Sequence, residues 1–231
     1  SDIILLGTDR IHLFDTPLLM CRNQGLSMEQ RAAKRVLDII VSGLGIIVSS
    51  PIMLIIAIAV KAYDGGPVFY LQDRLTYQGK EFRIRNFRSM CVDSEKNGAR
   101  LASKHDSRIT PVGHVLRNLH LDELPQLFNV FMGDMSLVGP RPERDVIMQE
   151  YEQEIPEFHY RLKVKAGLTG YAQVYGKYNT TPYDKLKLDL FYIENYSFLL
   201  DIKLLFMTVK IFFQKEVSEG VDDNQKNALK D

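Results

Sequence analysis

Residues Val36–Val60 read VLDIIVSGLGIIVSSPIMLIIAIAV and are apolar almost throughout. As one helix this stretch would be about 38 Å long, which exceeds the roughly 30 Å of a bilayer hydrocarbon core. Pro51 interrupts it, because proline donates no backbone hydrogen bond and its ring crowds the carbonyl four residues earlier. The hydroxyls of Ser49 and Ser50 can bond the freed backbone groups. The stretch therefore predicts a membrane segment with a break, and each arm is too short to span the core.

Basic residues flank this stretch on both sides. They are Arg31, Lys34, Arg35, Lys61, Arg74, Lys80 and Arg83. Such residues favour the cytoplasmic side of a membrane, so a single crossing would leave one basic flank outside. We therefore expect a re-entrant helix-break-helix over residues 36–60 that dips into one leaflet. A kinked single-pass helix is the alternative, since membranes tolerate proline in spanning helices.

Length and composition set the broad class. A chain of 231 residues predicts one main domain, and 29 Lys+Arg against 29 Asp+Glu gives no argument for nucleic-acid binding. Hydrophobic content of 45% with 25% charged residues is ordinary for a globular protein. Cys21 and Cys91 lack metal or redox spacing, which suits a reducing cytosol. The apolar stretch begins too late for a secretory signal peptide.

Three regions are expected along the chain. Residues 1–27 hold two strand-like stretches, Asp2–Gly7 and Pro17–Cys21, and we interpret them as the end of a preceding domain or an N-terminal addition. Residues 28–217 would form the main domain, and residues 218–231 a polar tail.

Local patterns predict the elements of the main domain. In chain order we expect a helix start at Ser27, a turn at Asp64–Pro67, strands at Val68–Leu71 and Glu81–Phe87, a helix opened by Thr110-Pro111, another beginning within Leu121–Leu127, a loop at Ser136–Pro142, a helix to about Gln153 and a turn at Gly167–Gly170. In the second strand Phe82 and Ile84 share one face. The expected fold class is α+β, mainly helical, with a small antiparallel sheet.

The C-terminal part, Pro182–Gln214, is predicted to be helical and rich in aromatic residues. Its apolar residues are interrupted by Asp201, Lys203 and Lys210, so it does not fit a membrane span. An amphipathic helix at the membrane interface fits, and a helix packed on a soluble core fits equally well.

The adjacent acids Asp122 and Glu123 lie just ahead of Leu124–Leu127. Acids at a helix start ordinarily cap free N–H groups and favour the helix dipole. Several arginines in loops or at the edges of elements suggest a phosphate-binding site as well. They are Arg88, Arg108, Arg117, Arg141 and Arg144. Prolines on both sides of Arg141 restrict its backbone, and a fixed arginine binds phosphate bidentately. Acids that can hold Mg²⁺ beside such arginines suit a diphosphate substrate.

Other catalytic patterns are missing from the sequence. There is no G-x-x-x-x-G-K-[ST] phosphate loop, no G-x-S-x-G elbow and no paired zinc spacing among His105, His114, His120 and His159. An ordinary ATPase or GTPase and a serine hydrolase are therefore disfavoured.

From about Gln30 to Phe213 the chain resembles the bacterial sugar transferase family. These are the monotopic polyprenyl-phosphate phosphoglycosyl transferases that begin capsule, exopolysaccharide, O-antigen and glycoprotein glycan assembly. The similar stretches are Lys34–Asp38, the Ser50-Pro51 break, Asn86–Met90, Leu121–Leu127, Gly133–Pro142 and Gly167–Gly170 through Gln173 and Gly176. The first residues look like the end of the extra domain of longer members. Members usually have Lys at position 86, and many have Arg at position 177, where this chain has Asn86 and Lys177.

The resemblance implies transfer of a sugar-1-phosphate from a UDP-sugar to undecaprenyl phosphate, with release of UMP, on the cytoplasmic face of the bacterial inner membrane. Asp122 would be the nucleophile that forms a covalent sugar-phosphate intermediate, and Glu123 would ligate Mg²⁺. The motif positions that would bind substrate are Arg88, Arg117, Gln126, Pro140 and Arg141. Ser50 and Pro51 would break a hairpin embedded in the lipid of one leaflet.

Two other functions are compatible with parts of the sequence. A non-catalytic monotopic scaffold for a glycan-assembly complex is one, although the intact Asp122-Glu123 pair and Pro140–Pro142 argue against it. A multi-pass polyprenyl transferase needs many apolar spans, and this chain has one. The sequence names neither the sugar nor the oligomeric state, and a homodimer is compatible with it.

Overall fold

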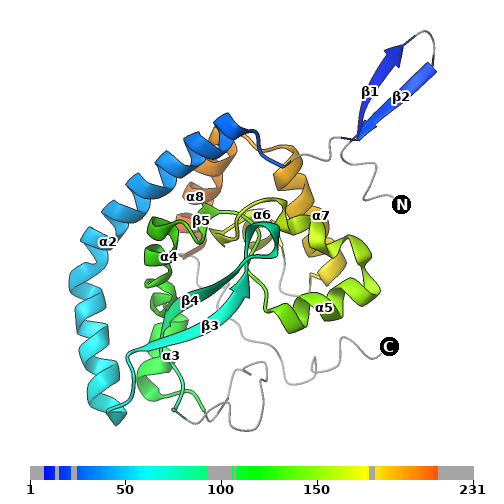
Figure 1. The fold of residues 1–231 in the computed structure, drawn as a ribbon. Helices are drawn as coiled ribbons and strands as arrows, with labels where there is room; N and C mark the ends of the chain where they lie inside the picture. Colours follow the sequence, from blue (N-terminus) through cyan, green and yellow to red (C-terminus); the bar gives the residue numbers. More distant parts are fainter. Residues whose placement is uncertain are drawn as a thin grey trace.

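The computed structural model describes residues 8–13, 16–21, 25–92, 106, 108–176 and 180–212. Within them the chain is mainly helical, with three two-stranded sheets (Figure 1). The elements in order are β1 (Thr8–Leu13), β2 (Thr16–Cys21), α2 (Met28–Asp64), β3 (Phe69–Leu75), η1 (Tyr77–Gly79), β4 (Glu81–Phe87), α3 (Pro111–Asn118), η2 (Leu121–Glu123), α4 (Gln126–Met132), β5 (Ser136–Val138), α5 (Asp145–Glu154), η3 (Pro156–Lys163), β6 (Gly167–Thr169), α6 (Tyr171–Tyr175), α7 (Pro182–Glu194) and α8 (Phe198–Phe212). The predicted coarse fold class is confirmed.

Helix α2 begins and ends where the sequence predicts. At its start the Ser27 hydroxyl accepts from the Gln30 N–H at 3.2 Å, and the Gln30 side chain accepts from the Ser27 N–H at 2.8 Å. This reciprocal capping box satisfies two N–H groups that have no partner within the helix. At its end Gly65 has φ +71°, a left-handed conformation that glycine adopts without steric cost.

Pro51 does not break α2 into two helices, contrary to the predicted break. Because proline has no N–H, the carbonyl of Ile47 loses its usual partner, and the Ser50 hydroxyl donates to that carbonyl at 2.8 Å. The hydroxyl of the adjacent Ser49 donates to the Gly45 carbonyl at 2.6 Å. The serines therefore bond backbone groups as predicted, and with that substitute bond the helix continues through the proline as a curved helix (Figure 1).

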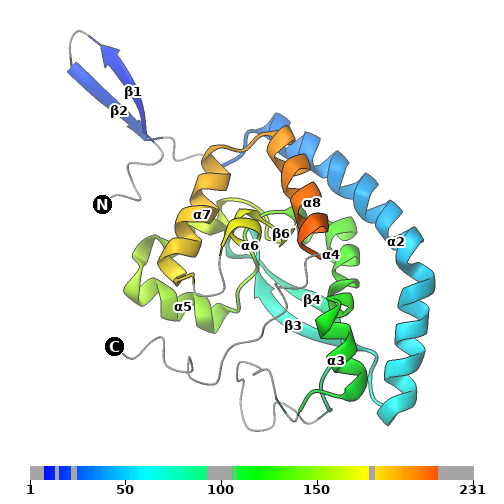
Figure 2. The same cartoon turned by 180° about the vertical axis from the view of Figure 1, so that it is seen from behind.

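One face of α2 packs along the domain through most of its length. It contacts α8 and β5, then α4, and then β4 and α3, so it curves around one edge of the domain (Figures 1 and 2). Near its middle Gly43 and Gly45 lie against Phe131 and Leu127 of α4. Toward its C-terminal end Met53, Ile56 and Val60 join Phe87 and Leu116 in a buried cluster.

The outer face of α2 is exposed and apolar. Its exposed large residues are Val36, Ile39, Ile40, Leu44, Ile47, Val48, Ile52, Leu54, Ile55 and Ile58. Within the described residues, α2 is the one helix that is long and apolar enough to cross a membrane. An exposed apolar surface of this extent indicates association with a membrane.

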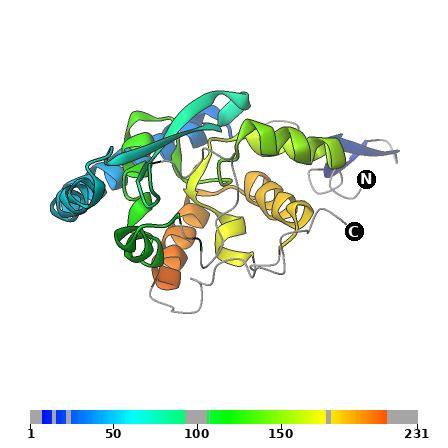
Figure 3. The same ribbon diagram turned by 90° about the horizontal axis from the view of Figure 1, so that it is seen from below.

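Strands β3 and β4 form the predicted antiparallel pair, with Phe69 opposite Phe87. Phe82 and Ile84 are both buried, which confirms the predicted face of β4. Figure 3 shows β3, β4 and α5 on one side of the domain and α6 and α8 on the other. The main core fills the space between, where Phe82 and Ile84 share a cluster with residues of α4, β5 and α8.

The predicted loop at Ser136–Pro142 and turn at Gly167–Gly170 are partly wrong. Ser136–Val138 and Gly167–Thr169 are the short parallel strands β5 and β6. Each strand is too short to show alternation, and its partner lies far away in the sequence. Local patterns therefore cannot reveal this pair.

The terminal regions agree with the sequence only in part. Strand β2 matches the predicted stretch Pro17–Cys21, and β1 and β2 pair with each other. The predicted strand Asp2–Gly7, Lys177 and the polar tail lie outside the described residues. The C-terminal helical region forms two helices, α7 and α8. Asp201 and Leu204 of α8 are fully buried, so α8 packs on the core while keeping an apolar outer surface: Phe198, Leu199, Phe206 and Val209.

Candidate active site

The acids Asp122 and Glu123 lie in a short 3₁₀ turn, η2, between α3 and α4. Thr110 caps α3, because its hydroxyl accepts from the Gly113 N–H at 2.9 Å. His120 then takes a left-handed conformation, φ +52°, which ends α3 and redirects the chain into η2. The predicted position ahead of a helix is confirmed, although the acids occupy their own turn and precede α4 by two residues.

Arg141 and Glu123 form an ion pair at this turn. The Arg141 Nη2 donates to Glu123 Oε1 at 2.9 Å. Burial alone would raise the pKa of the Glu123 carboxyl, but the charge and hydrogen bond of Arg141, together with His120, hold that pKa below its usual value. Glu123 is therefore anionic at neutral pH, and Arg141 remains half exposed, with 56% of its side chain accessible.

The pKa of the Asp122 carboxyl is shifted in the opposite direction, above its usual value. Burial and the neighbouring Glu123 charge raise the pKa of the Asp122 carboxyl, while Arg117 and His120 oppose the shift. Arg117 is held in place because its Nε donates to the Ser89 hydroxyl at 2.9 Å. Two neighbouring acids whose environments push their pKa values apart are a common arrangement for carboxylates with different catalytic roles.

Close backbone packing between β5 and β6 presents the loop that carries Arg141. The Gly139 N–H donates to the Thr169 carbonyl at 2.8 Å, and the Gly167 N–H donates to the Pro140 carbonyl at 2.9 Å. A Cβ atom on Gly167 would overlap the backbone nitrogen of Gly139, so a larger residue would push the strands apart. The close approach of the two backbones therefore requires glycine at both position 139 and position 167.

Four consecutive carbonyls of the loop each accept a hydrogen bond from a different donor. The Pro140 carbonyl is bonded by Gly167, and the Arg141 carbonyl accepts from Arg161 Nη2 at 3.0 Å. The Pro142 carbonyl accepts from Arg74 Nη1 at 3.2 Å, and the Glu143 carbonyl from the Leu75 N–H at 3.0 Å. The backbone beneath Arg141 is therefore fixed at four consecutive residues, as the flanking prolines predict.

A small polar hollow, open to solvent, lies beside Arg141. Buried Gln126 at the start of α4 donates from Nε2 to Asn86 Oδ1 at 2.8 Å, and both amides border the hollow. The residues that line it are Arg74, Ile84, Asn86, Gln126, Arg141, Pro142 and Gly167. The structure therefore brings Gln126, Pro140 and Arg141 to one region, with the acids next to it.

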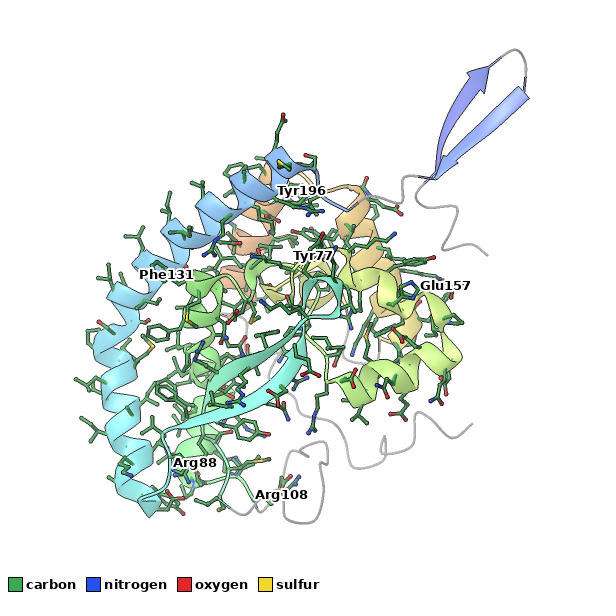
Figure 4. All side chains as sticks on the ribbon, viewed as in Figure 1. Tyr77, Arg88, Arg108, Phe131, Glu157 and Tyr196 are labelled. Carbon is green, nitrogen blue, oxygen red and sulfur yellow. The ribbon has the colours of Figure 1, made fainter. Side chains whose placement is uncertain are left out.

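Arg88 is differently placed from the other predicted arginines. Its buried guanidinium donates to Asp64 at the C-terminal end of α2 (Figure 4). The contact fixes the end of α2 against the segment that follows β4. Within the described residues, no hydrogen bond or ion pair links Arg88 to Asp122 or Glu123, so its predicted substrate contact stays a prediction.

Three residues of the site and its supporting structure were missed by sequence reasoning. His120 acts on the charges of both acids and could have been found from its position two residues before Asp122. Arg161 and Asp189 support the Arg141 loop from η3 and α7. Nothing in the local sequence distinguishes them from surface charges.

The donor groups fit a magnesium ion only in the presence of substrate. Among the described residues there is no group of three or more His, Cys, Asp or Glu side chains that could hold a metal. Asp122 and Glu123 supply two carboxylates, and Mg²⁺ is commonly bound by one or two carboxylates together with water and substrate phosphates. The two acids are therefore a suitable protein contribution to such a site.

Comparison with known proteins gives consistent similarities. Residues 29–215 match the family described as Bacterial sugar transferase. The chain is 44% identical over 180 residues to a UDP-N-acetylgalactosamine-undecaprenyl-phosphate N-acetylgalactosaminephosphotransferase of Aeromonas hydrophila, covering 77% of this chain and 43% of the relative. It is 43% identical over 208 residues to a UDP-glucose:undecaprenyl-phosphate glucose-1-phosphate transferase of Klebsiella pneumoniae, covering 88% and 43%.

A third relative is the undecaprenyl-phosphate galactose phosphotransferase of Salmonella typhimurium, 36% identical over 230 residues, with 92% of this chain and 47% of the relative covered. The chain therefore spans less than half the length of each of these three relatives.

Proposed function

This chain belongs to the bacterial sugar transferase family, and we propose that it transfers a sugar-1-phosphate from a UDP-sugar to undecaprenyl phosphate, releasing UMP. The observation that carries the proposal is the pair Asp122 and Glu123, whose pKa values are shifted in opposite directions. Glu123 of this pair is bonded to Arg141 on a fixed loop. The names of the three relatives support it, since each acts on undecaprenyl phosphate. Such a reaction would be the first membrane step in building a capsule, exopolysaccharide, O-antigen or glycoprotein glycan.

In the first step an Asp122 carboxylate oxygen attacks the sugar-bearing phosphorus of the donor. The bond from that phosphorus to the bridging oxygen breaks, and UMP leaves with the bonding electron pair. The product is an acyl phosphate that joins Asp122 to the sugar phosphate. Burial and the Glu123 charge raise the pKa of Asp122 and therefore its basicity, which favours attack, while the charge of Arg117 opposes this shift.

In the second step a phosphate oxygen of undecaprenyl phosphate attacks the same phosphorus and expels the Asp122 carboxylate. The product is a lipid diphosphate-linked sugar, and the enzyme is regenerated. Two steps mean that a soluble donor and a membrane lipid need not be aligned at the phosphorus at the same time. Arg141 and Arg117 would hold phosphate oxygens in both steps, and Gln126 and Pro140 would shape the donor site.

Glu123, and Asp122 before it reacts, would hold Mg²⁺ together with the donor diphosphate. When bound, the ion neutralises negative charge that develops on the departing phosphate. Arg141 keeps Glu123 ionised, so that this carboxylate is ready to bind a cation.

The position of α2 supports a monotopic enzyme on the cytoplasmic face of the inner membrane. A spanning helix would be surrounded by lipid in its middle, with the domain at one end only. Here α2 contacts β5 near Asp38, α4 near Gly43, and β4 and α3 near Val60. With its outer face apolar, α2 would lie embedded in one leaflet beneath the site, and the exposed apolar residues of α8 would rest at the interface.

The proposed activity is tested by UMP release from a panel of UDP-sugars in the presence of undecaprenyl phosphate. The panel includes glucose, galactose and their N-acetylated forms, because the relatives are named for different sugars. We expect UMP with at least one donor and a matching lipid-linked product. A full-length protein that releases no UMP from any donor would support the scaffold alternative.

A further inference from the structure

The guanidinium of Arg161 is a buried charge that contacts the backbone of Arg141. Arg161 lies in η3 and is 4% exposed, and its Nη2 donates to the Arg141 carbonyl at 3.0 Å. The same nitrogen lies 2.8 Å from Asp189 Oδ2, on α7, and Asp189 is 1% exposed. A chain of contacts therefore runs from α7 through Arg161 and Arg141 to Glu123.

Further contacts restrict the orientation of Arg161. Its Nη1 lies 3.6 Å from Glu143 Oε1, and its Cζ lies 4.8 Å above the centre of the buried Phe158 ring. A planar guanidinium held by two carboxylates and an aromatic ring has one orientation available. In this orientation Nη2 faces both the Asp189 carboxylate and the Arg141 carbonyl.

The Arg141 carbonyl accepts its hydrogen bond from Arg161. Both neighbours of Arg141 are prolines, which donate no backbone hydrogen bond, so the loop is fixed through its carbonyls. The Arg141 side chain is half exposed and depends on its backbone for direction toward Glu123. A small rotation at the Arg141 carbonyl would move the guanidinium away from the 2.9 Å contact.

Stability alone gives a weak reason for this buried ion pair. Removing two charges from water costs about as much as their attraction returns, and apolar replacements of buried pairs are often neutral or stabilising. The contact of Arg161 with a loop carbonyl instead has a direct effect on the geometry of Arg141.

We propose that Arg161 and Asp189 are positioning residues that set the direction of Arg141 toward Glu123 and the donor phosphate. Neither residue touches the substrate. The inference rests on the proposed transferase activity, and its kinetic test depends on that activity. A second test, by hydrogen exchange, measures the structure of the loop and does not depend on activity.

The kinetic test measures kcat and KM for UMP release in Arg161→Lys, Asp189→Asn and Arg141→Lys, alone and combined. Arg161→Lys keeps the positive charge but replaces the planar guanidinium, with its several N–H donors, by a single ammonium group. We expect roughly a ten- to hundred-fold fall in kcat/KM, the range for a hydrogen bond involving a charged group. If Arg161 acts through Arg141, the Arg141→Lys/Arg161→Lys double variant should be little worse than Arg141→Lys. Losses that multiply independently would overturn the proposal.

The matched control is the buried pair of Lys34 and Asp201, which are 2.6 Å apart and tie α2 to α8. Asp201→Asn should lower stability. Its effect on kcat/KM should be the same in wild type and in Arg141→Lys, because it does not act through Arg141. The apolar double variant Arg161→Met/Asp189→Leu separates stability from positioning further. It should unfold at a similar or higher temperature than wild type and still lose activity. Full activity in that variant would contradict the proposal.

Hydrogen exchange gives a test that does not depend on activity. The N–H groups of Gly167 and Leu75 donate to the Pro140 and Glu143 carbonyls of the loop, so their exchange reports its position. In Arg161→Lys and Asp189→Asn the peptides that contain Gly167 and Leu75 should exchange faster than in wild type, and in Asp201→Asn they should not. If no donor yields UMP with wild type, the proposed function fails and this comparison still tests the positioning. Unchanged exchange in both variants would overturn it.

Discussion

Arg141 donates from Nη2 to Oε1 of Glu123 at 2.9 Å, across eighteen positions of sequence. The contact joins the loop between β5 and α5 to the turn between α3 and α4. It also keeps the pKa of Glu123 low in a place where burial would raise it. The ionisation of one acid is thus controlled from a different motif.

The first prediction concerns this contact. In Arg141→Gln the pKa of Glu123 should rise, because burial remains and the opposing charge is gone. The acid limb of the pH profile of kcat/KM should therefore move to higher pH, with roughly a hundred-fold loss at neutral pH. Arg141→Lys keeps a positive charge and should shift the limb less. An acid limb that stays in place in Arg141→Gln would show that Glu123 does not control it.

The second prediction concerns the metal. Glu123→Gln retains the size of the side chain but removes the charge that would hold Mg²⁺, and we expect loss of most turnover, roughly a hundred-fold or more. Chelation of divalent ions should abolish UMP release by wild type, and added Mg²⁺ should restore it. Full activity after chelation, or in Glu123→Gln, would exclude this assignment.

The third prediction concerns the path of α2. Single cysteines replace Glu29 and Ala62, exposed residues near the two ends of α2, in a background without Cys21 and Cys91. In inverted and right-side-out vesicles both should react with an impermeant thiol reagent only from the cytoplasmic side. Reaction from opposite sides would establish a spanning helix.

The fourth prediction uses Asp189, whose burial raises the pKa of its carboxyl to about 6 from 3.8, against the opposing charge of Arg161. Between these pH values the folded state holds a proton that the unfolded state has released. Stability from this group therefore falls as pH rises from about 4 to about 6, by on the order of 3 kcal/mol.

The measurement is denaturant unfolding of wild type and Asp189→Asn from pH 4 to pH 7. The wild-type curve minus the variant curve should decline with rising pH across this window. A difference that rises with pH would mean that Arg161 lowers the Asp189 pKa by more than burial raises it.

Features with a local cause could be predicted from the sequence. The start of α2 follows from Ser27 and Gln30, whose side chains and backbone bond each other. The start of α3 follows from Thr110, and the buried face of β4 from the alternation of Phe82 and Ile84. Each depends on residues within a few positions of one another, which a sequence pattern displays directly.

Features that depend on distant partners could not be predicted. The pairing of β5 with β6 joins segments separated by two helical elements. The ion pair of Arg88 with Asp64 joins the segment after β4 to the end of α2, and no local pattern shows it. The continuity of α2 depends on a Ser50 hydroxyl that substitutes for one missing N–H, and a pattern of residue types does not show whether that bond forms.

The final prediction concerns Asp122 as the covalent nucleophile, and the most direct measurement is incubation of wild type with the UDP-sugar in the absence of lipid. We expect up to one equivalent of UMP per enzyme and a sugar-phosphate mass adduct on the peptide that contains Asp122. Asp122→Asn should stay folded, give neither signal and lose roughly four orders of magnitude in turnover. Catalysis without lipid-independent UMP or adduct would contradict the two-step account, and an adduct on Glu123 would contradict the assignment of Asp122.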